Sequence, residues 1–160
     1  MRRLILFRHA KAEPRAGGGD DFDRPLAERG REDAALMGRV LAREDLIPDL
    51  ALVSPARRAS ETWICAREAF GEARSELTPE LYNAAPEVIA AAVKAAADRA
   101  ETLMVVGHNP GLHEFAVQLL ISAAASAAEV TQIARKFPTT YPGNTSATYS
   151  ALTSNNRGFM

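Results

Sequence analysis

The sequence predicts an α/β fold in which parallel strands alternate with helices. Short apolar runs, such as residues 4–7 and 103–106, are bounded by charged or turn-forming residues, which is typical of strands covered on both faces. After these runs, apolar residues recur at helical spacing among charged residues. In 160 residues with 47% hydrophobic side chains, this alternation predicts one domain that spans residues 1–160.

The first half of the chain is predicted to hold two strands, each followed by a helix. Residues 3–7 form the first strand, and an amphipathic helix over 25–43 follows a glycine-rich loop. Residues 50–53 form the second strand. Ser54 is predicted to cap the next helix, with Pro55 in its first turn. The buried stripe of that helix is predicted to be Ala59, Trp63, Ala66 and Phe70.

The second half is predicted to continue this alternation and to end on a strand. In chain order its elements are a helix from Pro86, a strand over 102–106, a helix beyond Pro110, an alanine-rich helix over 122–136, a loop over 137–144 and a strand near 147–152. The polar tail over 153–160 is expected to fray.

Composition excludes several classes of partner. The chain has 19 basic and 20 acidic side chains and a net charge of −1, so it has no global field that would attract nucleic acid or anionic membranes. Cys65 is the only cysteine, which excludes an internal disulfide and a thiolate zinc site; we expect it on a buried helix face. No signal peptide or membrane span is evident, so a cytoplasmic location is expected.

Basic residues and histidines follow three predicted strands at the point where each strand ends. Arg8 and His9 follow the first strand, Arg57 follows the second, and His108 follows the third. Because parallel strands end at the same edge of a sheet, we expect these side chains to lie close together. Guanidinium groups bind phosphate oxygens bidentately, and helix N-termini add backbone N–H groups. The sequence therefore predicts a phosphate site.

A histidine in such a site has chemistry beyond binding. A neutral imidazole nitrogen is a nucleophile toward phosphorus, and a covalent phosphohistidine divides hydrolysis into two displacements. The second histidine, if protonated, would stabilise charge on the transferring group.

Four motifs resemble the histidine phosphatase superfamily, and in particular its small SixA-type phosphohistidine phosphatases. They occur in the order and spacing of that family, over roughly residues 3–121. The motifs are Leu6-Phe7-Arg8-His9-Ala10, Asp23-Arg24-Pro25-Leu26 with Glu28-Arg29-Gly30, Ser54-Pro55-Ala56-Arg57-Arg58-Ala59 with Glu61-Thr62, and Val106-Gly107-His108-Asn109-Pro110-Gly111.

The resemblance implies a three-layer α/β/α sandwich with a mostly parallel, phosphoglycerate mutase-like sheet. It implies that His9 is the phosphorylated nucleophile, that Arg8 and Arg57 bind the phosphoryl group, and that His108 is the second histidine of the site. Arg24 matches a further arginine of the small members, with either a direct phosphate contact or a loop-pinning ion pair as its role. No cofactor and no metal are expected.

The sequence also departs from the family pattern. Glycine is usual after the first histidine, whereas this chain has Ala10 and then Lys11, a cation that would favour an acidic or multiply phosphorylated substrate. Many relatives supply a glutamate as proton donor from a long insertion. Here Glu80 is the best candidate, with no carboxylic donor as the alternative, because an imidazole leaving group needs less protonation than an alkoxide.

Neighbouring charged residues are expected to have solvated roles. Arg58 is predicted to point away from the site, and Asp20, Asp21 and Asp23 to be solvated loop residues.

The function predicted from these residues is a metal-independent phosphatase that acts through phospho-His9 on a phosphohistidine-bearing protein. The alternatives are a small-molecule phosphomonoesterase of the same superfamily, with a mutase less favoured, and a phosphate-binding module without catalysis. The oligomeric state does not follow from the sequence.

Overall fold

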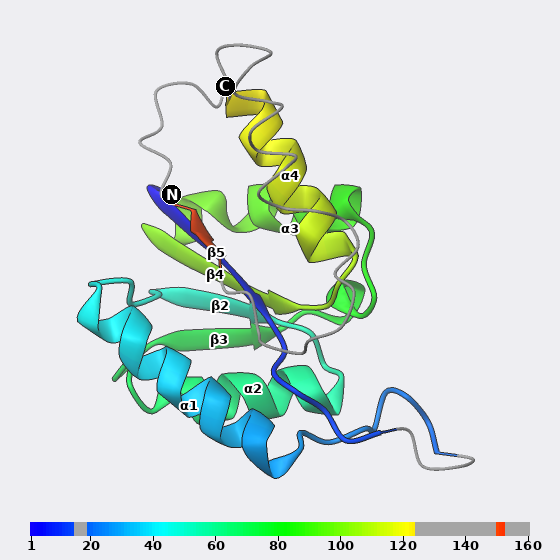
Figure 1. Cartoon of the computed structure of the whole chain (residues 1–160). Coiled ribbons are helices and arrows are strands. Elements are labelled where there is room, and N and C mark those ends of the chain that lie inside the picture. The colour runs from blue at the N-terminus through cyan, green and yellow to red at the C-terminus, as the bar shows by residue number, and fades with distance from the viewer. Residues whose placement is uncertain (15–18, 124–149, 153–160) are drawn as a thin grey trace.

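The computed structural model describes residues 1–14, 19–123 and 150–152. Its centre is a five-stranded sheet in the order β3-β2-β4-β1-β5 (Figure 1). The strands are β1 (Arg3–Arg8), β2 (Leu50–Val53), β3 (Arg74–Leu77), β4 (Thr102–Gly107) and β5 (Ser150–Leu152). Strands β1 to β4 are parallel and β5 is antiparallel to β1, which confirms the prediction of a mostly parallel sheet.

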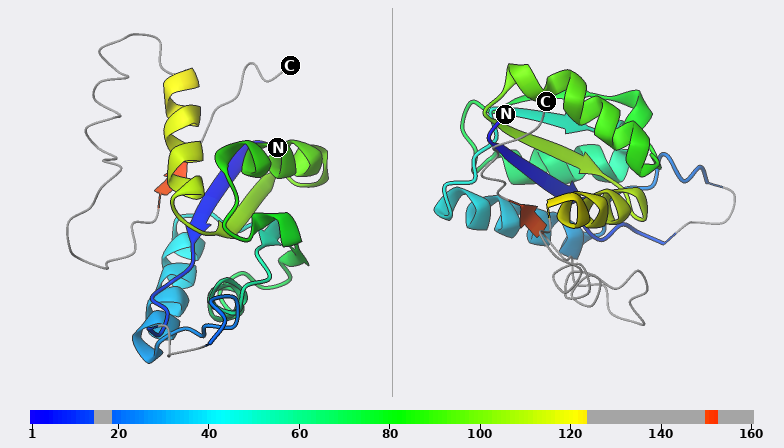
Figure 2. Two further views of the ribbon diagram at one scale, coloured as in Figure 1. Left: turned by 90° about the vertical axis from the view of Figure 1, so that its right-hand side faces the viewer. Right: turned by 90° about the horizontal axis from the view of Figure 1, so that it is seen from above.

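Helices cover both faces of the sheet and complete a three-layer α/β/α sandwich (Figures 1 and 2). The helices α1 (Glu28–Arg43) and α2 (Arg57–Arg67) pack together on one face, and α3 (Pro86–Ala96) and α4 (Gly111–Ala123) pack together on the other. Two short 3-10 helices, η1 (Pro79–Leu81) and η2 (Ala97–Arg99), lie before and after α3. Among the helices described, none is long and apolar enough to cross a membrane.

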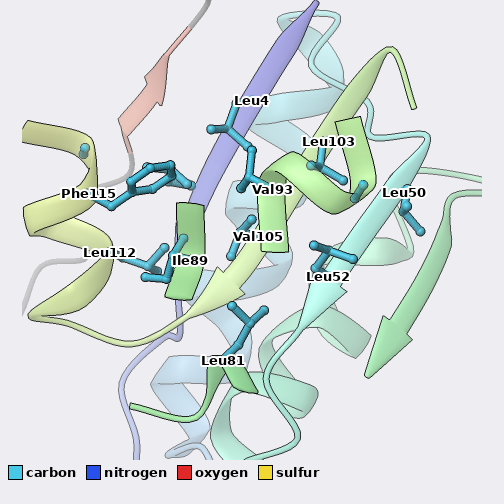
Figure 3. Packing of buried hydrophobic residues seen from close by; sticks show 13 residues of the cluster. Leu4, Leu50, Leu52, Leu81, Ile89, Val93, Leu103, Val105, Leu112 and Phe115 are labelled. Carbon is cyan, nitrogen blue, oxygen red and sulfur yellow. The ribbon is translucent and has the colours of Figure 1, made fainter. Parts of the chain in front are cut away.

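The two hydrophobic layers are built from alternate residues of the same strands. Leu4 of β1 belongs to the cluster that contains Ile89 of α3 and Phe115 of α4 (Figure 3). The next residue, Ile5, belongs to the opposite cluster, which contains Trp63 of α2. Successive side chains of a strand point to opposite faces, so a strand covered on both sides needs an unbroken apolar run. This is why the central strands were recognisable in the sequence.

The two helices of the lower layer in Figure 1 differ in how well they could be predicted. All four residues of the stripe predicted for α2 are buried, although Phe70 lies beyond the end of the helix at Arg67. In α1, Leu41 is buried, but Leu36, which is also apolar, is 50% exposed. A small residue, Gly38, makes the contact with α2 instead. A Cβ at this position would lie 2.3 Å from the carbonyl oxygen of Ala66. The close approach of α1 to α2 therefore depends on a residue that an apolar pattern does not reveal.

Several predicted boundaries are corrected by the structure. The helix predicted from Pro25 begins at Glu28, because Leu26 pairs with Ala12 in an isolated bridge. Strand β3 was not predicted, since its four residues are all exposed at the edge of the sheet and carry no apolar pattern. In the alanine-rich segment, α4 extends to Ala123; the remainder of that predicted helix, the loop over 137–144 and the tail over 153–160 lie outside the described residues.

Three strands end in register at one edge of the sheet. Phe7 of β1 and Val53 of β2 both pair with Val106 of β4. Beyond them, the backbone N–H of His9 donates to the carbonyl of Gly107 at 3.0 Å, and that of Ser54 donates to the carbonyl of Val106 at 2.9 Å. The sheet itself thus places the residues that follow β1, β2 and β4 next to one another.

Candidate active site

His9 presents one ring nitrogen as a hydrogen-bond donor and the other as a lone pair. Its Nδ1 lies 2.8 Å from the carbonyl oxygen of Ala10. Because a carbonyl only accepts, Nδ1 carries the proton, and Nε2 keeps its lone pair. The guanidinium Nε of Arg58 donates to this Nε2 at 3.3 Å. The atom suited to nucleophilic attack is therefore defined, and a cationic group lies beside it.

The arginine beside His9 is Arg58, and not Arg57. Arg58 is only 2% exposed, so the prediction that it points away from the site is wrong. The side chain of Arg57, placed in the site by the sequence analysis, is 55% exposed and bonds to Glu61 at 2.8 Å. Helix phase explains the exchange: Arg58 lies one turn before Thr62 on the buried face of α2, whereas Arg57 lies one turn before Glu61.

His108 lies across from His9 and bonds to Ser54. The two imidazole centroids are 5.1 Å apart, and the Nε2 of His108 is 2.8 Å from the hydroxyl oxygen of Ser54. Ser54 is fully buried and does not cap α2 through its side chain as predicted; the N-cap of α2 is Ala56. The reason is that α2 begins two residues later than expected, which leaves the Ser54 hydroxyl free to face His108.

The bond with Ser54 indicates which nitrogen of His108 carries the proton. Within the described part of the chain, Nε2 of His108 is the only acceptor recorded for the Ser54 hydroxyl. With Ser54 as donor, Nε2 holds the lone pair and Nδ1 carries the proton. This Nδ1 is buried and has no partner among the described residues. A buried N–H without a partner is rare in folded proteins, and an oxygen of a bound anion would satisfy it.

Burial and nearby positive charges favour the neutral form of both histidines. Burial lowers the pKa of His9 to about 4, and the charges of Arg58, Arg8 and Arg24 lower it further against the raising effect of the Ala10 carbonyl. Burial, followed by His9 and Arg58, lowers the pKa of His108 to about 3. His108 is thus a neutral hydrogen-bond donor at neutral pH before an anion binds.

Asp21 connects two arginines of the site. Its carboxylate lies 2.9 Å from Nη2 of Arg58 and 3.0 Å from Nη2 of Arg24. Partial desolvation raises the pKa of Asp21, but the charges of Arg58 and Arg24 and the Tyr82 hydroxyl outweigh it, so the pKa lies below its usual value. The prediction that Asp21 is a solvated loop residue is wrong. Its ionised carboxylate satisfies the charge of a buried guanidinium.

Tyr82 is a part of the site that the sequence analysis missed. Its ring packs edge-on against His108, with centroids 5.6 Å apart, and Phe22 packs edge-on against Tyr82 at 5.1 Å. Its hydroxyl lies 3.2 Å from an oxygen of Asp21. Tyr82 follows β3 and η1, and since β3 itself carries no strand pattern, the sequence offered no signal that residue 82 returns to this edge.

The remaining predicted residues lie at the margin of the site. Arg8 and Lys11 are exposed, and Arg8 acts on His9 through its charge. Arg24 makes the loop-pinning ion pair that was one of its two predicted roles, and its Nε is buried without a partner among the described residues. Glu80 is exposed in η1, two residues before Tyr82.

No group of three or more side chains suited to binding a metal occurs in residues 1–14 and 19–123. The polar groups that surround His9 are guanidiniums, imidazole and a carboxylate already paired with arginine. This donor set favours an anion.

Comparison with known proteins places this site in a family. The sequence profile of the histidine phosphatase superfamily (branch 1) matches residues 4–85. The chain belongs to the histidine phosphatase superfamily. An uncharacterized protein of Mycobacterium tuberculosis is 37% identical over 134 residues, which cover 83% of this chain and 82% of that protein.

Solved structures agree with this assignment. A protein of Agrobacterium tumefaciens, described as a phosphohistidine phosphatase SixA, is 30% identical with a TM-score of 0.75, over 88% of this chain and 86% of its own. The fold is shared with a tungstate complex of the protein histidine phosphatase SixA (24% identity, TM-score 0.66, 73% of this chain and 76% of that one). It is also shared with a phosphoglycerate mutase of Plasmodium falciparum (18% identity, TM-score 0.55, 83% and 76%). As a histidine phosphatase superfamily member with such neighbours, the chain is a phosphatase.

Proposed function

We propose that this phosphatase acts through a covalent intermediate on Nε2 of His9. The observation that carries the proposal is the pairing of that atom with Arg58. The Ala10 carbonyl holds the proton on Nδ1, so Nε2 has a lone pair, and the Arg58 Nε–H lies 3.3 Å away. A phosphoryl oxygen that accepts the Arg58 N–H would free the lone pair and bring phosphorus next to it.

The groups around His9 supply hydrogen-bond donors and positive charge for a phosphoryl group. Arg58 would donate from Nε, and His108 would donate from Nδ1, which has no partner among the residues that the structure describes. Arg24 adds a positive charge beside them. Donors fixed in place before the reaction stabilise the transition state without reorganisation. Because the pKa of His108 is lowered by burial and by nearby positive charges, we expect a bound anion to raise it.

The reaction proceeds as two displacements at phosphorus. In the first, Nε2 of His9 forms the N–P bond, the bond to the leaving group breaks, and the leaving group takes the electron pair. His9 is then a phosphorylated imidazolium, whose Nδ1–H still donates to the Ala10 carbonyl. In the second, water attacks phosphorus, the N–P bond breaks, and inorganic phosphate and neutral His9 are produced.

We propose phosphohistidine of another protein as the substrate, and we expect neither a metal nor a cofactor to take part. A departing imidazole whose second nitrogen is protonated leaves as a neutral ring and needs no acid. The similar Agrobacterium protein is described as a phosphohistidine phosphatase. The guanidinium-rich surroundings of His9 suit an anion and oppose a cation. A reducing cytoplasmic location is consistent with the single cysteine.

Trapping the intermediate tests the mechanism. We expect brief incubation with a radiolabelled phosphohistidine protein to give a labelled adduct that is acid-labile and stable to base. His9→Ala should abolish the adduct, whereas His113→Ala, a histidine of α4, should retain it. Absence of an adduct in a wild-type protein that binds phosphate would instead support the phosphate-binding module.

Turnover of alternative substrates tests the leaving group. We expect kcat/KM for a phosphohistidine protein to exceed that for alkyl phosphate esters. Higher turnover of alkyl esters would favour the small-molecule phosphomonoesterase. If Glu80 is the proton donor for esters, Glu80→Gln should slow ester hydrolysis far more than phosphoramidate hydrolysis; equal losses would contradict that role.

A further inference from the structure

Asp21 contacts three side chains around His9, which a solvent-exposed loop residue would not do. Its two carboxylate oxygens form ion pairs with Nη2 of Arg24 at 3.0 Å and with Nη2 of Arg58 at 2.9 Å. They also accept a hydrogen bond from the hydroxyl of Tyr82 at 3.2 Å. Its backbone carbonyl accepts from Nη1 of Arg58 at 2.6 Å. One residue thus binds both terminal nitrogens of the arginine that reaches His9.

The ion pair between Asp21 and Arg58 differs from a surface ion pair. Surface pairs contribute little because both charges remain hydrated. Here the side chain of Arg58 is 3% exposed, and Asp21 is the carboxylate that it contacts. A buried guanidinium that loses its counter-ion is strongly unfavourable. The position of Arg58 in the site therefore depends on Asp21.

The orientation of Arg58 follows from how its five N–H bonds are shared. Asp21 binds the edge formed by Nη1 and Nη2, and this leaves Nε directed at Nε2 of His9. A phosphoryl oxygen placed at His9 would meet the Nε–H without displacing Asp21. The carboxylate and the substrate therefore use different parts of one guanidinium.

We propose that Asp21 is a positioning residue that holds Arg58 and Arg24 in place for the phosphoryl group on His9, and that its negative charge lets product phosphate leave. This inference rests on the proposed function. The two arginines carry two positive charges and Asp21 carries one negative charge. Without Asp21, a phosphate dianion would face two uncompensated cations, so it would bind more tightly to a site whose Arg58 is less well placed.

A role for Asp21 as a proton donor conflicts with the same contacts. A donor must be protonated, whereas the oxygens of Asp21 accept from two guanidiniums and a phenol. Charge-assisted hydrogen bonds to the ionised form favour that form. The contribution of Asp21 therefore acts through Arg58 and Arg24.

Asp21→Asn tests the proposal against a control on the neighbouring residue. Asp20→Asn removes the same charge one position away, and an asparagine can still accept the Phe22 N–H that Asp20 accepts at 3.0 Å. For Asp21→Asn we expect kcat to fall about 10-fold or more, because a misplaced catalytic group loses its alignment. We expect the dissociation constant of inorganic phosphate, measured by calorimetry, to decrease. Asp20→Asn should leave both values within about twofold of wild type.

Asp21→Glu separates charge from position. It keeps the negative charge but shifts the carboxylate by one methylene, so we expect kcat to fall while phosphate affinity stays near that of wild type. The proposal is overturned if kcat of Asp21→Asn matches that of Asp20→Asn, or if phosphate binding weakens together with kcat. If the wild-type protein binds phosphate without turnover, the proposed function fails, while the phosphate affinities of the three variants still test the charge effect of Asp21.

Discussion

The Nε of Arg58 donates to the Nε2 of His9 across 3.3 Å, and this bond joins the residue after β1 to the first turn of α2. It is possible because β1 and β2 end in register on either side of β4. The fold thus holds the proposed nucleophile and a cation at contact distance. The energetic cost of bringing them together is met during folding, before any substrate binds.

Exchanging the two adjacent arginines for lysine should give very different results. We expect Arg58→Lys to lower kcat/KM by about 100- to 1,000-fold, because a fixed donor to the transferring group is lost. Arg57→Lys should change kcat/KM by less than about threefold, since it alters an exposed ion pair with Glu61. Steady-state kinetics, with thermal unfolding to verify folding, measure both. A larger loss of kcat/KM in Arg57→Lys than in Arg58→Lys would indicate that Arg57, and not Arg58, contacts the phosphoryl group.

In Ser54→Ala, the proton of the His108 ring should no longer be fixed on one nitrogen. Without the hydroxyl, Nε2 loses the donor at 2.8 Å, and the proton is free to occupy either ring nitrogen. We expect 15N NMR of histidine-labelled protein to show the Nδ1–H form of His108 in wild type and a mixture in Ser54→Ala. Turnover should fall by about 10-fold, which is less than the loss of about 100- to 1,000-fold that follows removal of a donor. An unchanged tautomer would show that another group fixes His108.

The residues of the site differed in how far the sequence could define them. His9 and His108 were predictable because each follows an apolar run, and the runs belong to neighbouring strands of the sheet. Arg58 was not, because the choice between it and Arg57 depends on where α2 begins, and a one-residue shift turns a side chain by about 100°. Asp21 and Tyr82 come from a turn and from a segment beyond an exposed edge strand. Only packing determines where such segments return.

The fold likewise has some features that the sequence predicts and others that it does not. Strands β1, β2 and β4 have both faces buried, so composition alone marks them. The contact of α1 with α2 depends on Gly38, where the absence of a side chain is the relevant feature. An apolar pattern reports which side chains are buried, but it does not report where two backbones come close.

His108, which is buried, and His9, which is partly buried, should make stability depend on pH. The pKa values of His9 and His108 are lowered from 6.5 to about 4 and about 3, so between pH 6.5 and these values the unfolded chain binds protons that the folded protein does not. Their contribution is therefore fully present above pH 6.5 and is lost as pH falls. We expect the unfolding free energy to decrease by roughly 1 kcal/mol per pH unit for each histidine.

Urea unfolding between pH 7 and pH 5 measures this dependence. The carboxyl groups of Asp21 and Glu61, whose pKa values are lowered from 3.8 and 4.5, lose their contribution only below this range. A His9→Gln, His108→Gln double variant should therefore show a flatter pH dependence than wild type. Equal slopes in the two proteins would mean that the histidines are not buried in the neutral form.

Gly111→Ala should damage both stability and turnover. A Cβ at position 111 would lie 1.9 Å from the carbonyl oxygen of Ala84, so α4 or the segment that carries Tyr82 must move. We expect a loss of about 1–3 kcal/mol of unfolding free energy, as for overpacked cores. Turnover should also fall, because Tyr82 packs against His108.

Gly71→Ala is the matched control for that substitution. Gly71 has a φ of +62° and open space around its Cβ position, so alanine there costs about 1 kcal/mol of backbone strain without a clash. Since Gly71 lies between α2 and β3, far along the chain from both histidines, kcat should stay unchanged. If Gly111→Ala loses stability but keeps wild-type kcat, then Tyr82 does not help to position His108, and its ring serves only to fill the layer beside η1.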